Sequence, residues 1–169
     1  EYFEGDQLLD FNEVKNEKIL LEIIKQICFT LYYLHQSNYI YYDLKPENIL
    51  VTSKNGKIKI KFIDFGFAFF YHNVNEIEVR GSAEYIAPEV LKKEFIDHRC
   101  DLYSFGILLY RIIYDRFPFS STEELEIYKS HIANEFEFPE SSYSENIIKL
   151  TKKLLAKDPS DRFTSTLEI

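Results

Sequence analysis

Three polar side chains lie close together in the sequence, at Asp43, Lys45 and Asn48, and a further carboxylate follows at Asp64. Phosphoryl transfer needs such an inventory of groups. A carboxylate orients the attacking hydroxyl and accepts its proton, and a lysine neutralises the charge that grows on the transferred group. An amide and a second carboxylate provide the hard oxygen ligands that magnesium prefers. The residue types and their spacing therefore predict a magnesium-dependent phosphotransfer site.

Helices are predicted on both sides of these residues. Residues 16–36 carry apolar side chains at three- and four-residue spacing, which predicts an amphipathic helix with Asn16 as its N-cap. Residues 100–114 are apolar on nearly all sides, which predicts a buried helix. Two further helices are predicted over residues 123–134 and 144–156.

A small hairpin is predicted between the two groups of polar residues. Its strands lie near residues 49–52 and 57–62, and the turn dipeptide Asn55-Gly56 joins them. Because the hairpin leads to Asp64, it should bring that carboxylate beside the first loop. Helices outnumber strands, so the predicted fold class is mainly α (α+β), a helical bundle with one β-hairpin on the face that carries Asp43.

Composition and charge narrow the class of protein. The chain has 169 residues, of which 46% are hydrophobic, and this argues against disorder. Its net charge of −8 argues against a general nucleic-acid binder, and no apolar run is long enough to cross a membrane. Cys28 and Cys100 sit in apolar stretches and fit buried thiols in a reducing, cytoplasmic setting. His35 and His72 are interpreted as solvent or core histidines.

Three motifs follow one another along the chain. They are Asp43-Leu44-Lys45-Pro46-Glu47-Asn48, Asp64-Phe65-Gly66 and Ala87-Pro88-Glu89. In this order, with a hairpin between the first two, they resemble the signature set of the eukaryotic-type protein kinases. The resemblance covers residues 1–169 and implies the hinge and C-terminal lobe of a kinase domain. Lys45 resembles the serine/threonine pattern, and the hinge and Pro-Glu-Asn stretch resemble the calcium/calmodulin-dependent and cyclic-nucleotide-dependent groups.

Four other stretches extend the resemblance to the ends of the chain. Residues 1–6 resemble the hinge between the two lobes, and residues 81–85 resemble the Gly-Thr-x-x-Tyr stretch. Residues 101–106 resemble the start of the central helix, with Tyr103 where Trp is usual, and residues 158–162 resemble a motif near the end of the lobe.

The resemblance implies a role for each matching residue. Asp43 is the expected catalytic base, Lys45 the phosphate contact, and Asn48 and Asp64 the magnesium ligands. The remaining expected roles are adenine binding by the backbone of Glu1 and Phe3, substrate docking by Glu47, Ser82 and Tyr85, bracing of the catalytic loop by Asp101, and a buried structural ion pair between Glu89 and Arg162. The implied cofactors are ATP and Mg²⁺, and the implied partner is a protein substrate.

Two departures from the family concern regulation. Tyr42 stands where an Arg usually precedes the catalytic Asp, which is the non-RD pattern, and Glu78 stands where relatives carry a phosphorylated residue. Either Glu78 mimics a phosphate and finds another cation such as Arg80, or aromatic packing holds the loop; we favour the packing, by Phe67, Phe69, Phe70 and Tyr71. Control would then come from a regulatory segment or domain outside this chain.

A third departure concerns the peptide substrate. Basophilic relatives use acidic residues of the hinge, catalytic loop and central helix to bind arginines. Glu47 remains, but Gln7 and Arg111 occupy the other two positions. A cation at Arg111 should repel a substrate arginine, so weaker basic selectivity is predicted.

The glycine-rich loop, strand lysine and partner glutamate of the family have no counterpart in the sequence, and we expect them to precede Glu1 in a longer protein. A pseudokinase, which uses the fold for binding, is the alternative function, and a lost strand lysine would favour it. A small-molecule phosphotransferase is disfavoured because residues 81–89 resemble a peptide-docking loop.

Overall fold

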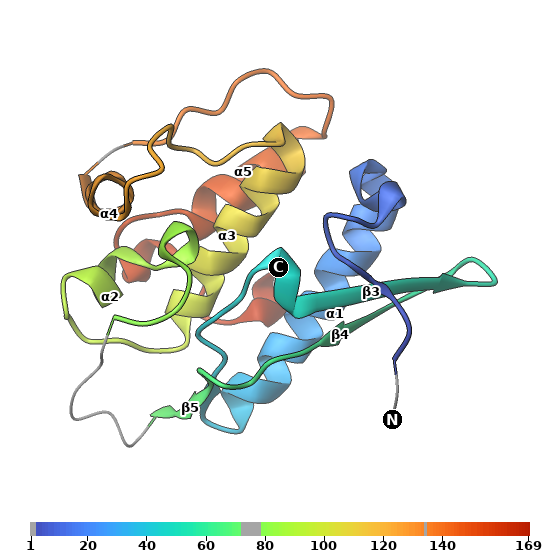
Figure 1. Cartoon of the computed structure of the whole chain (residues 1–169), viewed down its shortest axis with the longest axis horizontal. Coiled ribbons are helices and arrows are strands. Elements are labelled where there is room, and N and C mark those ends of the chain that lie inside the picture. Colours follow the sequence, from blue (N-terminus) through green and yellow to red (C-terminus); the bar gives the residue numbers. More distant parts are fainter. Residues whose placement is uncertain (1–2, 72–78, 134) are drawn as a thin grey trace.

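The computed structural model describes residues 3–71, 79–133 and 135–169 (Figure 1). The helices are α1 (Glu17–Gln36), α2 (Pro88–Leu91), α3 (Arg99–Tyr114), α4 (Glu124–Ala133) and α5 (Glu145–Leu154), and short 3-10 turns occur at Asn12–Lys15, Pro46–Asn48, Ala83–Tyr85, Pro159–Asp161 and Thr166–Glu168. None of the described helices is long and apolar enough to cross a membrane.

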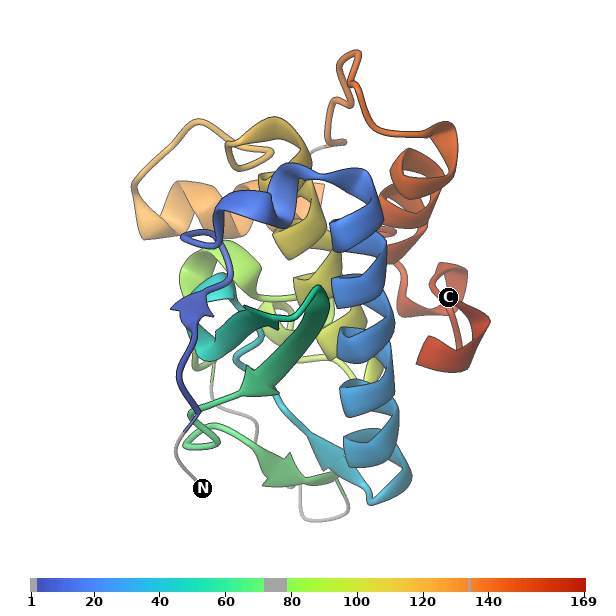
Figure 2. The same cartoon turned by 90° about the vertical axis from the view of Figure 1, so that its right-hand side faces the viewer.

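Helix α1 forms as predicted. Its N-cap Asn16 accepts backbone N–H bonds from Lys18 and Ile19, which satisfies two of the donors that a helix start leaves open. One face of the helix is buried, through Leu20, Ile23, Ile24, Ile27, Cys28 and Leu31. This face contacts β4 (Lys57–Phe62) and the C-terminal turn, so the helix backs the hairpin that leads to Asp64 (Figure 2).

The predicted hairpin is confirmed. Strands β3 (Ile49–Lys54) and β4 pair antiparallel, and Lys54 faces Lys57 across the turn. Asn55 and Gly56 both have positive φ, at 53° and 72°, as a two-residue type I′ turn requires.

Three short strands add to the sheet content beyond the predicted single hairpin. β1 (Asp6–Gln7) pairs with β3, and β2 (Tyr39–Ile40) pairs with β5 (Phe69–Phe70). Two-residue strands are too short to show an alternating pattern, so they could not be predicted from the sequence. The fold is therefore a mixed α/β arrangement of helices with a three-stranded and a two-stranded sheet.

Helix α3 is the buried helix that the sequence predicted, and it begins at Arg99 rather than Cys100. It packs against α5, and a Cβ at Gly106 would lie 2.8 Å from Leu155 Cγ. That close approach explains a glycine in a helix interior, where it normally destabilises. Both cysteines are buried free thiols, as expected.

Candidate active site

The Asp43 carboxylate lies in the loop between β2 and β3 and is almost completely buried. Lys45 Nζ pairs with Asp43 Oδ2 at 2.9 Å and donates to Ser82 Oγ at 2.9 Å. The Ser82 hydroxyl in turn lies 3.5 Å from Asp43 Oδ1, which confirms the expected contact between these two residues. The structure thus brings together a carboxylate, an ammonium and a hydroxyl from segments nearly forty residues apart.

Gly81 permits this close approach. Its φ is +96°, a conformation that side chains disfavour, and a Cβ there would lie 3.3 Å from Asp43 Oδ1. Both the backbone conformation and the space therefore favour glycine beside the carboxylate.

Asn48 is fixed by Asp43. Its Nδ2 donates to the Asp43 backbone carbonyl at 2.9 Å and to Asp43 Oδ2 at 2.8 Å. Since both amide protons are directed at Asp43, the amide oxygen is the Asn48 atom left to ligate a cation. This orientation fits the expected role of Asn48 as a magnesium ligand.

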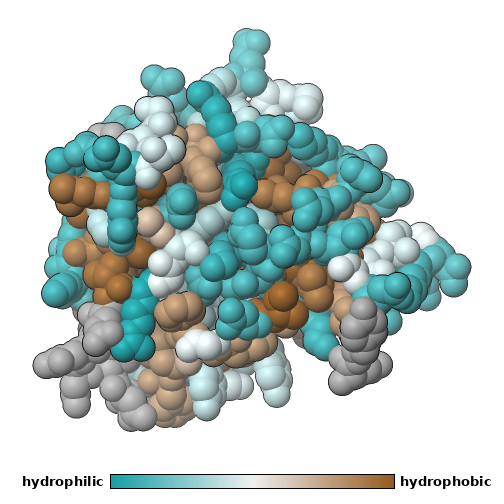
Figure 3. Space-filling view, in the orientation of Figure 1, coloured by the Kyte–Doolittle hydropathy of each residue, from teal (hydrophilic) through white to brown (hydrophobic). Residues whose placement is uncertain are grey.

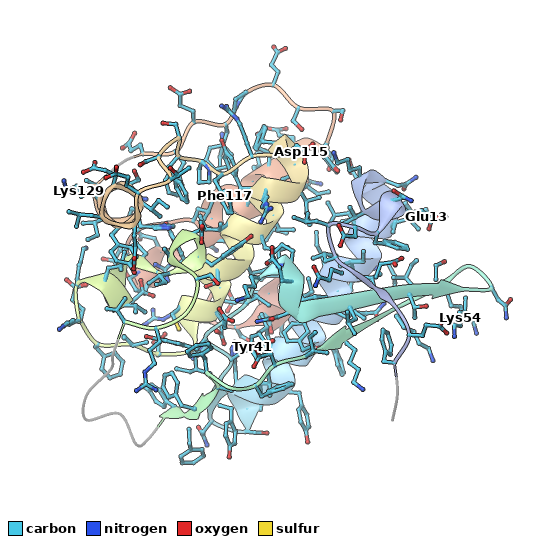
Figure 4. All side chains as sticks on the ribbon, in the orientation of Figure 1. Glu13, Tyr41, Lys54, Asp115, Phe117 and Lys129 are labelled. Carbon is cyan, nitrogen blue, oxygen red and sulfur yellow. The ribbon has the colours of Figure 1, made fainter. Side chains whose placement is uncertain are left out.

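Asp64 reaches the same region through the end of β4. The N–H of Ile63 donates to the Asn48 carbonyl at 2.9 Å, which ties the Asp64 segment to the catalytic loop. Burial first, and then the carboxylates of Asp43 and Asp64, raise the pKa of Tyr41 above its usual range. Tyr41, which is labelled near the centre of the molecule in Figure 4, donates its hydroxyl to the carbonyl of Ile63, the residue before Asp64.

Asp101 braces the loop that carries Asp43, as expected. It is fully buried at the start of α3, where Oδ2 accepts the Tyr41 N–H at 2.9 Å and Oδ1 accepts the Tyr42 N–H at 2.8 Å. His35 Nε2, from the last turn of α1, lies 2.8 Å from Asp101 Oδ2. His35 is therefore a core histidine, one of the two interpretations offered from sequence, and its contact with Asp101 was not predicted. Its place four residues after the buried Leu31 was the available signal.

The segment that carries Ser82 is anchored by the expected ion pair. Arg162 Nη1 and Nη2 donate to the two Glu89 carboxylate oxygens at 2.6 and 2.8 Å, and both side chains are buried. The guanidinium also donates to the backbone carbonyls of Ala156, Arg99 and Lys157. All five of its N–H groups are thus used.

Two of the three expected substrate-docking residues, Glu47 and Tyr85, contact Arg111. Its Nη1 donates to the Tyr85 hydroxyl at 2.8 Å and lies 3.5 Å from Glu47 Oε1. Tyr85 itself is buried, with 5% of its surface exposed, so it contacts Arg111 through its hydroxyl rather than offering its ring face to a substrate. Arg111 also stacks over Phe117, at 4.7 Å from the ring centre.

Aromatic packing holds part of the loop after Gly66. Tyr42 meets Phe69 edge to face at 5.1 Å, and Tyr71 meets Phe95 at 6.1 Å. Phe70 meets Tyr39 edge to face at 5.5 Å, and Phe67 is 37% exposed. Glu1 and Glu78 lie outside the described residues. Phe3 is described, and the Lys61 Nζ atom lies over its ring, 5.9 Å from the ring centre.

A buried hydrogen-bond relay replaces the usual Trp of the central helix. The Tyr103 hydroxyl lies 2.8 Å from His131 Nδ1, and His131 Nε2 lies 3.1 Å from the Ala83 carbonyl, next to Ser82. A neutral imidazole can accept from Tyr103 and donate to Ala83. Burial, and then the positive charge of Lys157, lower the pKa of His131 to about 4, which keeps it neutral.

This relay predicts an acid-sensitive contribution to stability. In the unfolded chain His131 titrates near 6.5, so below that pH the unfolded state binds a proton that the folded state binds only near pH 4. Stability contributed by His131 is fully present above pH 6.5 and falls with pH, by about 2 kcal/mol between pH 7 and pH 5.

Denaturant unfolding of the full-length protein and its His131→Gln variant at both pH values measures the contribution of His131. The other titrating groups are the same in both proteins, so their effect cancels in the comparison. An equal loss of stability in the two proteins would contradict it, as would an NMR titration that places the His131 pKa near 6.5.

Comparison with known proteins identifies the family of this chain. The family model for the protein kinase domain matches residues 1–168, and the chain belongs to the protein kinase domain family. It is 34% identical over 160 residues to serine/threonine-protein kinase 17A of Oryctolagus cuniculus, and 36% identical over 166 residues to cAMP-dependent protein kinase type 3 of Saccharomyces cerevisiae. It is 33% identical over 174 residues to myosin light chain kinase 3 of Rattus norvegicus.

These matches cover 92%, 96% and 98% of this chain, in the same order. The chain spans only 40% of the length of the first two relatives and 22% of the third.

Proposed function

We propose that the protein containing this chain is an ATP-dependent protein kinase that phosphorylates serine and threonine residues of proteins in the cytoplasm. The observation that carries the proposal is the convergence of Asp43, Lys45 and Ser82, with Asn48 oriented by the same carboxylate. The family membership and the names of the relatives support a protein substrate.

The side chains can divide the work of phosphotransfer as follows. Asp43 Oδ2 and Oδ1 are held by Lys45, Asn48 and the Ser82 segment, so the carboxylate is preorganised to orient a substrate hydroxyl and accept its proton. Lys45 lies 2.9 Å from that carboxylate and places a positive charge where charge grows on the transferred group.

The donor set fits magnesium ATP, which supplies the phosphoryl group when bound. The Asn48 amide oxygen and the exposed Asp64 carboxylate are hard oxygen ligands. The described residues contain no cluster of three His, Cys, Asp or Glu side chains placed to hold a metal. Two protein ligands suit magnesium, which usually keeps waters and substrate phosphates as its other ligands. The backbone of Glu1 and Phe3 would hold adenine.

The test is phosphotransfer by the full-length protein. Incubation with γ-labelled ATP, magnesium and a degenerate peptide library should label serine and threonine, as phosphoamino-acid analysis would show. Binding of ATP without any labelled product, in a protein that carries the strand lysine, would instead establish the pseudokinase alternative.

The surface formed by Glu47, Tyr85 and Arg111 is proposed to bind the peptide substrate with weak selectivity for basic residues. Burial acts against the charge of Arg111, yet the Tyr85 hydroxyl and the Glu47 carboxylate together raise its pKa, so it remains a cation. Arg111 therefore already pairs with the Glu47 carboxylate, and a substrate arginine would be repelled by the positive charge of Arg111.

Reversing this charge should create basic selectivity. In Arg111→Glu, the preference for an arginine over an alanine upstream of the target hydroxyl should rise by about tenfold, because two carboxylates would then face the substrate. A peptide array with wild type, Arg111→Gln and Arg111→Glu measures it, and Arg111→Gln should fall between the other two. A wild-type enzyme with a dominant requirement for two upstream arginines would refute this proposal.

A further inference from the structure

A groove with a volume of about 560 Å³ lies between α1 and the β3–β4 hairpin. We call it the lysine groove, because its lining includes Lys18 and Lys25 of α1 and Lys57 and Lys59 of β4. Figure 2 shows these two elements side by side, and Figure 3 shows hydrophilic side chains over the hairpin end at the right of that face. The groove lies on the far side of the hairpin from the N-terminal strand β1.

The four lysines of the groove outnumber the one carboxylate in its lining. Within the part of the chain that the structure describes, none of the four has a carboxylate within ion-pairing distance. Lys15, Lys129 and Lys149, by contrast, pair with carboxylates at 2.7 to 2.8 Å. The single acid in the lining, Glu22, accepts a hydrogen bond from Gln26. A concentrated positive charge on a chain of net charge −8 is therefore available to an outside group.

The lining of the groove also contains apolar side chains. Ile58 is buried, Ile19 is half-buried, and Leu21 is 41% exposed although it is a large apolar side chain. Apolar surface framed by polar residues is typical of an interaction site. The occupant should therefore carry both negative charge and apolar side chains.

The edge of the sheet is closed to backbone pairing at this groove. β4 is an outer strand, and such a strand could pair with a partner strand. Gln26 prevents this, because its Nε2 donates to the Ile58 carbonyl at 3.0 Å and its Oε1 accepts the Ile60 N–H at 3.1 Å. An occupant must bind through side chains, which makes the lysine charges decisive.

We propose that the lysine groove is a docking site for an acidic, apolar-containing segment of a partner protein. Charge complementarity selects the acidic segment, and the concave shape with apolar side chains in its lining selects a peptide over a membrane surface. The net charge of −8 would repel the extended phosphate backbone of a nucleic acid. The groove lies apart from Asp43 and Asp64, so this inference stands independently of phosphotransfer.

The experiment uses the full-length protein without ATP and a fluorescent synthetic peptide in which Asp and Glu flank paired leucines. We expect saturable binding by fluorescence anisotropy that weakens as salt increases. The double variant Lys57→Glu/Lys59→Glu should bind at least about tenfold more weakly, since two exposed attractive charges become repulsive. Peptides with Asn and Gln for the acids, or serine for the leucines, should also bind more weakly.

The matched control is Lys129→Glu, on α4 at the opposite side of the molecule from Lys54 of the hairpin (Figure 4). It makes the same lysine-to-glutamate change at one site outside the groove, against two sites in the double variant, and should leave binding within about twofold of wild type. Equal weakening by Lys129→Glu would overturn the proposal, and so would no peptide binding at all. Binding of phosphatidylserine vesicles or a single-stranded oligonucleotide in place of the peptide would also overturn it. Circular dichroism of each variant shows whether it is folded.

Discussion

Replacing Asp43 by asparagine in the full-length protein should lower kcat by about 10²- to 10⁴-fold, with a much smaller effect on the affinity for ATP. The reason is that Asp43 acts on the substrate hydroxyl: the amide cannot accept its proton. The substitution keeps the shape of the side chain, and its oxygen can still accept a bond from Asn48, which now donates to Oδ2 at 2.8 Å. Steady-state kinetics together with a nucleotide-binding measurement separate the two effects.

The companion variant Asp64→Asn should behave differently. It removes the charged metal ligand, so magnesium-dependent phosphotransfer and magnesium-dependent nucleotide binding should both be lost. Normal turnover in either variant would refute the assigned roles. Arg116→Gln, a charge change outside the assigned catalytic and docking residues, is a control that should leave kcat unchanged.

The prediction from sequence was strongest where a local pattern repeats or a motif is complete. The hairpin was found because Asn55 and Gly56 mark its turn, and both take positive φ. The contact between Ser82 and Asp43 was expected only through the resemblance, since nothing in the local sequence relates residues 39 positions apart.

The relays that support the site could not be predicted in this way. His35 and His131 each complete a hydrogen-bond network through residues from other helices, Asp101 and Tyr103. The place of His35 after Leu31 indicated only the buried face of α1, because the partner of a single histidine is fixed by packing. The pairing of Arg111 with Tyr85 is similar: the sequence indicated a cation at the substrate side, but it did not show that the buried Tyr85 holds it.

The unpaired charge of the lysine groove also required the structure. Lys57 and Lys59 alternate along β4, which indicates one exposed face of a strand. Their proximity to Lys18 and Lys25 follows only from the packing of α1 on β4.

Replacing Arg162 by leucine should lower the free energy of unfolding of the full-length protein's kinase domain by about 3–5 kcal/mol. The Glu89 carboxylate would then be a buried charge without its partner, and three backbone carbonyls would lose their donor. The cost far exceeds that of an exposed pair. Lys149→Ala, which breaks an exposed pair with Glu145, should change stability by less than about 1 kcal/mol.

The double variant Glu89→Leu/Arg162→Leu separates the two causes. Removing the orphaned charge should make it more stable than Arg162→Leu, while the unsatisfied carbonyls should keep it less stable than wild type. Arg162→Lys keeps a positive charge but cannot form the two-pronged contact, so it should lose less stability than Arg162→Leu. It keeps the comparison possible if the leucine variant fails to fold. Denaturant unfolding measures all four. Equal stability of Arg162→Lys, Arg162→Leu and wild type would show that this pair does not anchor the segment. The expected order would instead show that a buried ion pair, away from Asp43, stabilises the segment that carries Ser82.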